Sequence, residues 1–243
     1  MFPIRDHNPS EKTPFVTYAL LVANVAIFLL IWPLFSDPEA LQRFYLTWGL
    51  VPRLSDPSTF LTSMFLHGGV MHLLGNMLFL WIFGDNLEEE MGHLGFLAFY
   101  LAGGIAAAGL QVAADPRSTI PMVGASGAIA AVLGGYLLMF PKARVDILLF
   151  FVIIIRIIPV PAWLMLGVWF GMQVIGGYSA NSQTGGVAYW AHAGGFIAGF
   201  ALTLPVWLRR GGPAFWSRTE GHPPHPEARY RFQRSSVPPV RRK

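Results

Sequence analysis

Ser126 lies between two small residues in the run VGASGAIAAVLGG, residues 123–135, which contains no charged side chain. A serine hydroxyl is a weak nucleophile until a neighbouring base removes its proton. Histidine can act as that base near neutral pH. His192, in the run YWAHAGGFIAGF, is the only acidic, basic or histidine side chain of a second apolar run. Ser126 and His192 are therefore candidates for a nucleophile and its general base.

A third run, HGGVMHLLGNMLFL, contributes groups that could stabilise an oxyanion. His72 and Asn76 are four residues apart and share one face of a helix, with His67 nearer its outer end. The amide of Asn76, a ring N–H of His72 and the main-chain N–H of Ser126 are possible donors. No acidic residue lies in either of the other two runs, so a serine–histidine dyad is the simplest arrangement.

The elements that carry these residues are long apolar runs. The chain has 243 residues, of which 53% are hydrophobic and 12% charged, whereas soluble domains contain about 25% charged residues. There are no cysteines, which excludes disulfides and thiolate metal sites. A spanning helix needs about 20 apolar residues. Six runs are candidates, which predicts an all-α polytopic membrane protein built as a six-transmembrane-helix bundle: residues 15–35, 59–83, 94–114, 124–140, 161–178 and 186–208.

Basic residues set the expected orientation and domain organisation. With the N-terminus in the cytoplasm, only Arg43, Arg53 and Arg117 of the 17 basic residues lie outside, as the positive-inside rule favours. We therefore expect a cytoplasmic segment over residues 1–14, a membrane domain over 15–208 and a cytoplasmic tail over 209–243. The tail is basic and rich in proline, which predicts disorder. It serves either as a contact with anionic lipid or as a plain topology anchor.

The run VDILLFFVIIIRIIPV, residues 145–160, fits none of the six helices. It is short for a seventh span, and a strand exposed to lipid would leave backbone groups without partners. We favour an interfacial or partly buried segment that leads into the fifth helix over a seventh span.

Depth in the membrane brings the polar residues together. The second, fourth and sixth helices all run from outside to inside, and each carries its polar residues in its outer part. Small residues at spacings of four let membrane helices approach closely: Gly127, Ala131 and Gly135 in the fourth helix, and Gly195 and Gly199 in the sixth. The alternative is that Ser126 is only a packing residue and that His192 only bonds between helices.

These three motifs resemble those of the rhomboid intramembrane serine proteases. The matching segments are GASG at 124–127, AHAGG at 191–195 and HGGVMHLLGN at 67–76. The resemblance implies that Ser126 is the nucleophile, that His192 is the base and that Asn76 and His72 form the oxyanion hole. The supporting positions that it implies are His67, Gly124, Gly127, Gly195, Gly199 and Glu88, the last in the segment FGDNLEEEMG.

The chain departs from the rhomboid pattern at two places. Many members carry a Trp-Arg pair before the second helix, where this chain has Ser58 and Thr59. Some members stack the catalytic histidine on a tyrosine four residues after the serine, where this chain has Ala130. Neither departure removes a reacting group.

The resemblance implies an intramembrane serine endopeptidase that cleaves transmembrane segments of other membrane proteins near their outer end. The expected partners are these substrates and the lipid bilayer, with no cofactor, metal or nucleic acid, and the expected location is the plasma membrane of a prokaryote. It also makes residues 161–178 the candidate helix for lateral substrate access. The alternative is a non-proteolytic membrane-protein binding protein or a transporter. A zinc protease is disfavoured because the chain has no H-E-x-x-H motif.

Overall fold

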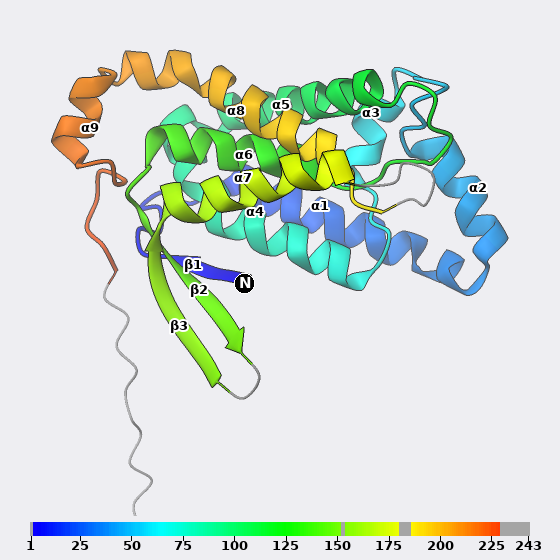
Figure 1. The fold of residues 1–243 in the computed structure, drawn as a ribbon, viewed down its shortest axis with the longest axis horizontal. Helices are drawn as coiled ribbons and strands as arrows, with labels where there is room; N and C mark the ends of the chain where they lie inside the picture. The colour runs from blue at the N-terminus through cyan, green and yellow to red at the C-terminus, as the bar shows by residue number, and fades with distance from the viewer. Residues whose placement is uncertain (1, 152–153, 180–185, 229–243) are drawn as a thin grey trace, which may run out of the picture.

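The computed structural model describes residues 2–151, 154–179 and 186–228. Within these residues the chain is mainly a bundle of helices (Figure 1). Four segments are long and apolar enough to cross a membrane, by length and composition, and α6 is apolar but shorter. The main helices of the bundle are α1 (Phe15–Ile31), α4 (Val70–Met91), α5 (His93–Ala114), α6 (Ser126–Met139), α7 (Ala162–Ser179) and α8 (Tyr189–Arg209).

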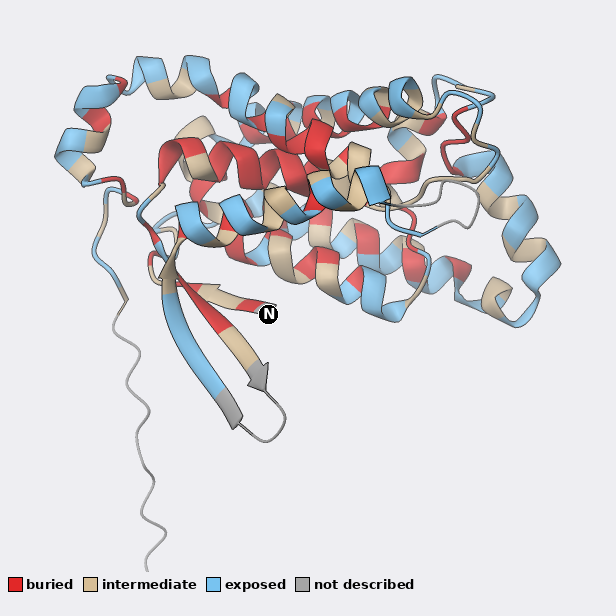
Figure 2. Cartoon of the chain, viewed as in Figure 1, coloured by how far each residue is buried: buried red, intermediate tan, exposed pale blue. Residues whose placement is uncertain are grey.

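Helix α6 lies at the centre of this bundle. Most of its residues are buried, and Figure 2 shows it almost wholly in the colour of buried residues. It packs against α4, α5 and α8, so its surface is apolar all round, as expected for an enclosed helix. Its 14 residues span about 21 Å, less than the bilayer's apolar core of about 30 Å. Because other helices enclose α6, its ends can lie below the membrane surfaces.

The contact between α6 and α8 depends on small residues. A Cβ atom on Gly195 would collide with the main-chain oxygen of Gly127, and one on Gly199 would collide with the main chain of Ala131. The two helices therefore touch through their backbones, at the positions that the spacing of small residues predicts.

Helix α4 begins later than predicted. The expected second helix starts at residue 59, but residues 59–65 form two short pieces, α3 (Thr59–Thr62) and the 3-10 turn η2 (Ser63–Phe65). Gly68 and Gly69 separate them from α4, because glycine is a poor helix former. Before them, the 3-10 turn η1 (Trp32–Ser36) and helix α2 (Pro38–Trp48) form the connection from α1.

A small antiparallel sheet is the main departure from an all-α fold. It has the strand order β1 (Phe2–Asp6), β2 (Arg144–Phe151), β3 (Ile154–Pro161). Residues 145–151 and 154–160 are therefore paired strands and not a seventh spanning helix. The segment is partly buried and leads into α7, as expected, but its strand conformation was not predicted. Its β-branched side chains favour strands. Pairing with β1 gives hydrogen-bond partners to the backbone N–H and C=O groups on the edge of β2 that β3 does not reach.

Residues 209–228 of the C-terminal segment are also structured. Helix α9 (Pro213–Thr219) follows α8. Beyond it, Gly221 O accepts a hydrogen bond from Lys142 N at 2.9 Å, and the main-chain N–H of Ala228 donates to His7 O at 2.7 Å. The predicted disorder is thus wrong for residues 209–228, because these contacts hold them against the connection between α6 and β2 and against the N-terminal segment. Residues 229–243 of that tail lie outside the described residues.

Candidate active site

Ser126 and His192 meet where α6 begins. Ser126 is the first residue of α6, and His192 lies in the first turn of α8. Their side chains are 2.8 Å apart, measured from Ser126 Oγ to His192 Nε2. Both residues are half-buried. This is the distance over which a histidine can take the proton of a serine hydroxyl.

Two residues of α7 contact the other side of the His192 ring. Gln173 Oε1 lies 2.8 Å from His192 Nδ1. The Trp169 ring stacks on the imidazole with 5.8 Å between ring centroids and 29° between planes. Sequence reasoning missed both contacts. The available signal was a lone glutamine in an otherwise apolar helix, since buried polar groups in membrane spans suggest function.

Gly124, two residues before Ser126, has a backbone conformation that few residues other than glycine adopt. Its φ is +132°, in the region that favours glycine. A Cβ atom there would lie 2.8 Å from His72 Nε2 and 3.6 Å from Ser126 Oγ. The Gly124 N–H donates to Ser63 O at 2.9 Å. Gly124 is thus required both for the turn and for the close approach of the His72 ring to Ser126.

The orientation of His72 suits a hydrogen-bond donor. Its Nδ1 accepts from the Gly68 N–H at 3.3 Å, so in the neutral ring the proton is on Nε2, the nitrogen above Gly124. The buried His67 ring packs against His72 edge to face, with 5.2 Å between centroids. Tyr45 O–H holds the backbone there by donating to His67 O at 2.8 Å.

Asn76 lies one helical turn beyond His72 on α4. It is only 7% exposed. Among the described residues, its Nδ2 has no hydrogen-bond acceptor. The main-chain N–H of Ser126 also has no acceptor inside its own helix, because it belongs to the first turn. The α6 N-terminus adds its positive dipole end at the same point.

Glu88 lies far from the dyad and caps α1. Its carboxylate accepts from the main-chain N–H groups of Val16 and Thr17, each at 2.8 Å, and from the Thr17 hydroxyl at 2.7 Å. His93 Nδ1 lies 2.6 Å from the same carboxylate. Glu88 is 12 residues beyond Asn76, or about 18 Å along α4. Glu88 therefore joins α1 to α4, and a supporting role at the dyad stays a prediction.

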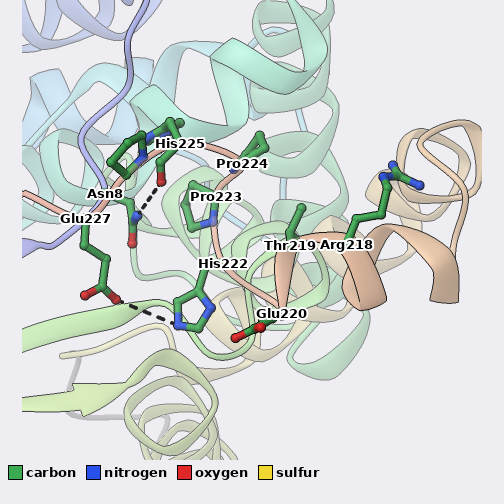
Figure 3. A pocket seen from close by; sticks show the side chains of 10 residues that line it. Asn8, Arg218, Thr219, Glu220, His222, Pro223, Pro224, His225 and Glu227 are labelled. Carbon is green, nitrogen blue, oxygen red and sulfur yellow. Dashed lines mark hydrogen bonds and ion pairs between the residues drawn. The ribbon is translucent and has the colours of Figure 1, made fainter.

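Two cavities differ in their relation to the dyad. A narrow one of about 10 Å³ lies against Ser126 and is lined mainly by small residues, among them Gly104 and Ala107. A wide one of about 580 Å³ lies at the other end of α6, lined by Asn8 and residues 218–220 and 222–227. Figure 3 shows this second cavity, with Asn8 bonded to the His225 carbonyl and His222 facing Glu227. The larger cavity contains neither Ser126 nor His192.

Comparison with known proteins gives one consistent result. A family model described as a rhomboid domain matches residues 55–209. The chain is 33% identical over 191 residues to rhomboid protein 1, mitochondrial, of Saccharomyces cerevisiae, covering 76% of this chain and 51% of that protein. It is 26% identical over 211 residues to RHOMBOID-like protein 12, mitochondrial, of Arabidopsis thaliana, covering 80% and 58%.

A bacterial relative is the rhomboid protease GluP of Bacillus subtilis, 34% identical over 158 residues, which cover 65% of this chain and 27% of that protein. The chain spans about half the length of the yeast and Arabidopsis relatives. The yeast and Arabidopsis relatives are mitochondrial by name and GluP is from a bacterium, so the expected prokaryotic plasma membrane stays a prediction.

Proposed function

Because this chain belongs to the rhomboid family and is an integral membrane protein, we propose that it is an intramembrane serine endopeptidase. Its substrates are transmembrane segments of other membrane proteins. The observation that carries the proposal is the 2.8 Å contact between Ser126 Oγ and His192 Nε2. A packing serine needs no such partner, whereas a nucleophile does.

The reaction follows the usual course for a serine nucleophile. His192 Nε2 takes the Ser126 hydroxyl proton as Oγ attacks the carbonyl carbon of the scissile peptide bond. The C–N bond then breaks, and His192 returns the proton to the leaving amine. A water molecule then attacks the carbonyl carbon of the acyl ester and loses its proton to His192. The ester bond to Ser126 breaks, and His192 returns this proton to Oγ, which releases the acid and restores the serine hydroxyl.

The oxyanion of each tetrahedral intermediate is stabilised by three donors. These are the Asn76 amide, His72 Nε2–H and the Ser126 main-chain N–H, all at the N-terminal end of α6 or on the neighbouring part of α4. Donors that are held in place before the reaction cost no reorganisation when charge develops. The buried Asn76 amide without an acceptor supports its part in this role.

The proposed membrane orientation puts both termini in the cytoplasm and all six bundle helices across the bilayer. The N-terminal end of α6, and Ser126 with it, then faces the outer side. Since α6 is about 21 Å long, Ser126 lies below the outer membrane surface. Cleavage therefore occurs near the outer end of the substrate segment, where its helix must unwind to expose a peptide bond.

The proposal is tested with Ser126→Ala, His192→Ala and the double variant, purified in detergent and assayed on a model transmembrane substrate. Each single change should lower kcat by about 10⁴-fold or more, and the double variant should be no worse, because the two groups act as a unit. Ser217→Ala removes an exposed hydroxyl of α9 and serves as the matched control. A fluorophosphonate should label the wild type but not Ser126→Ala. Normal turnover by folded Ser126→Ala would end the proposal.

A further inference from the structure

We propose that Gln173 of α7 is a positioning residue that selects the tautomer of His192, and that Trp169, one turn earlier, holds the plane of the ring. The kinetic part of this inference rests on the proposed proteolytic function. The structural part, which nitrogen of His192 carries the proton, does not.

The amide of Gln173 can adopt only one orientation at its site. Its Nε2 donates to the Trp169 main-chain oxygen at 3.3 Å. A carbonyl oxygen is an acceptor only, so the NH₂ group must face it and Oε1 must face His192. A flipped amide would set two oxygens against each other on the Trp169 side and lose this bond.

The fixed amide determines the protonation of the imidazole. Gln173 Oε1 cannot donate, so the 2.8 Å contact with His192 Nδ1 requires a proton on Nδ1. A neutral imidazole then has its lone pair on Nε2, the nitrogen 2.8 Å from Ser126 Oγ. This is the tautomer that a general base needs. After proton transfer, the same oxygen accepts from the imidazolium.

Trp169 supplies a second constraint on the ring. Its indole stacks on His192 and also contacts Phe196, one helical turn further along α8, with 6.1 Å between centroids. Ala130, four residues after Ser126, is fully buried under α8 and has no ring to offer. The stacking surface for His192 is therefore Trp169 of α7.

The location of Gln173 on α7 excludes a solvent-facing role. Only three described residues of α7 are buried, Ala162, Leu166 and Gln173. Their spacing defines one inward face, while residues such as Val168 and Met172 point outward. Burying an amide costs free energy unless it is hydrogen-bonded. An aliphatic residue would pack there without this cost, so the hydrogen bond to His192 explains the choice of glutamine.

The test compares Gln173→Met with Gln173→Glu in the full chain. Methionine has a similar length but no oxygen acceptor, whereas glutamate keeps an oxygen at the same reach. The matched control is Gln111→Met: Gln111 Oε1 accepts from the Ala191 N–H at 3.1 Å, so this change breaks a glutamine bond to α8 without touching the His192 ring. Two readouts are used, kcat and KM on the model substrate, and ¹⁵N NMR of the histidine rings, with His192 assigned from the His192→Ala spectrum.

We expect Gln173→Met to lower kcat about 10- to 100-fold with KM little changed. A partner residue that holds a catalytic histidine in the wrong tautomer lowers kcat by about 10⁴-fold. The expected loss is smaller here, because methionine holds His192 in neither tautomer and leaves part of it in the active one. The His192 signals should change from Nδ1–H alone to a mixture. Gln173→Glu should restore most of kcat, and Gln111→Met should keep both the wild-type tautomer and kcat within about threefold of wild type.

Two results would overturn the inference: a wild-type His192 tautomer in Gln173→Met, or a loss of kcat in Gln111→Met as large as in Gln173→Met. If Gln173→Met does not fold, an Nε2–H signal for His192 in the wild type is sufficient to reject it. If the wild type cleaves no substrate, the proposed function fails, while the NMR spectra still decide the role of Gln173.

Discussion

The side chain of Asn76 has a donor group that the described part of the structure leaves unused. Burying an amide N–H without an acceptor costs about 1–3 kcal/mol. An asparagine that only stabilises the helices would place its NH₂ group against a carbonyl, as Asn24 does within α1 by donating to Leu20 O at 2.7 Å. The open NH₂ of Asn76 instead fits a donor whose acceptor forms only during the reaction.

Replacing Asn76 by alanine should therefore affect rate more than stability. We expect kcat to fall by at least about tenfold with KM little changed, because the lost bond exists only in the transition state. Loss of a single oxyanion donor costs about 100- to 1000-fold in enzymes with few alternatives, and here His72 and the Ser126 N–H share the task. Measuring kcat beside a melting curve separates the roles: a large fall in Tm with normal kcat would assign Asn76 to structure.

The sequence predicted that Ser126 and His192 lie together, but not that Gln173 and Trp169 contact the His192 ring. The shared depth of Ser126 and His192 and the glycines on both helices were readable from the sequence, because both follow helical periodicity. The contact between Gln173 and His192 depends on the rotation of α7 about its own axis. That rotation is set by packing and leaves no periodic signal in so uniformly apolar a helix.

At the element scale, the position of His192 beside Ser126 depends on the close approach of α6 and α8. The neighbour of Gly199 is the main chain of Ala131, which cannot move aside as a flexible side chain would. The helices can accommodate a methyl group only by separating, and the dyad lies less than two turns of α8 away from that contact.

Gly199→Ala should consequently lower both Tm and kcat, although alanine is intrinsically the better helix former by about 1 kcal/mol. The matched control is Gly109→Ala in α5, where a Cβ atom would meet no atom within 4 Å. We expect this control to leave activity unchanged and Tm unchanged or higher. Equal Tm values for the two variants would show that α6 and α8 can separate without cost, contrary to the packing described above.

The elements were predicted unevenly. Five of the six bundle helices begin and end within a few residues of the expected positions, because long apolar runs are a strong signal. The exception is α4. The hairpin of β2 and β3 was missed. Its β-branched residues indicated strands, but the strand partner, β1, lies about 140 residues away at the N-terminus, and such distant pairing cannot be read from local sequence.

In the molecule as a whole, the N-terminal segment, the strand β2 and residues 216–228 meet near the C-terminal end of α6. Arg5 and His7 bond to Asp146 of β2, at 2.8 and 2.7 Å. Burial alone would raise the pKa of Asp146, but these bonds outweigh it and hold the pKa below its ordinary value. Asp146 therefore stabilises the fold above the ordinary aspartate pKa, and this contribution is lost as the pH falls through its lowered pKa.

Asp6, the last residue of β1, behaves in the opposite way. It is 6% exposed and accepts from Asn86 Nδ2 at 2.9 Å and from the Tyr136 hydroxyl at 3.3 Å. Burial, and then the nearby charge of Asp85, raise its pKa to about 7. In the unfolded chain the pKa is about 3.9. The contribution of Asp6 to stability is therefore fully present below about pH 4 and is lost as the pH rises towards 7.

Attachment of β1 should weaken between pH 5 and pH 8, and Asp6→Asn should reduce this dependence, since asparagine cannot ionise and keeps an oxygen acceptor. We expect hydrogen exchange of the amides in residues 2–6 to be faster at pH 8 than at pH 5, beyond the intrinsic effect of pH on exchange, and Asp6→Asn to slow it mainly at pH 8. Asp56→Asn is the matched control: hydrogen bonds from Ser58 lower the pKa of the exposed Asp56, so it stays ionised throughout this range. If exchange in Asp6→Asn depends on pH as steeply as in the wild type, the titrating group is not Asp6.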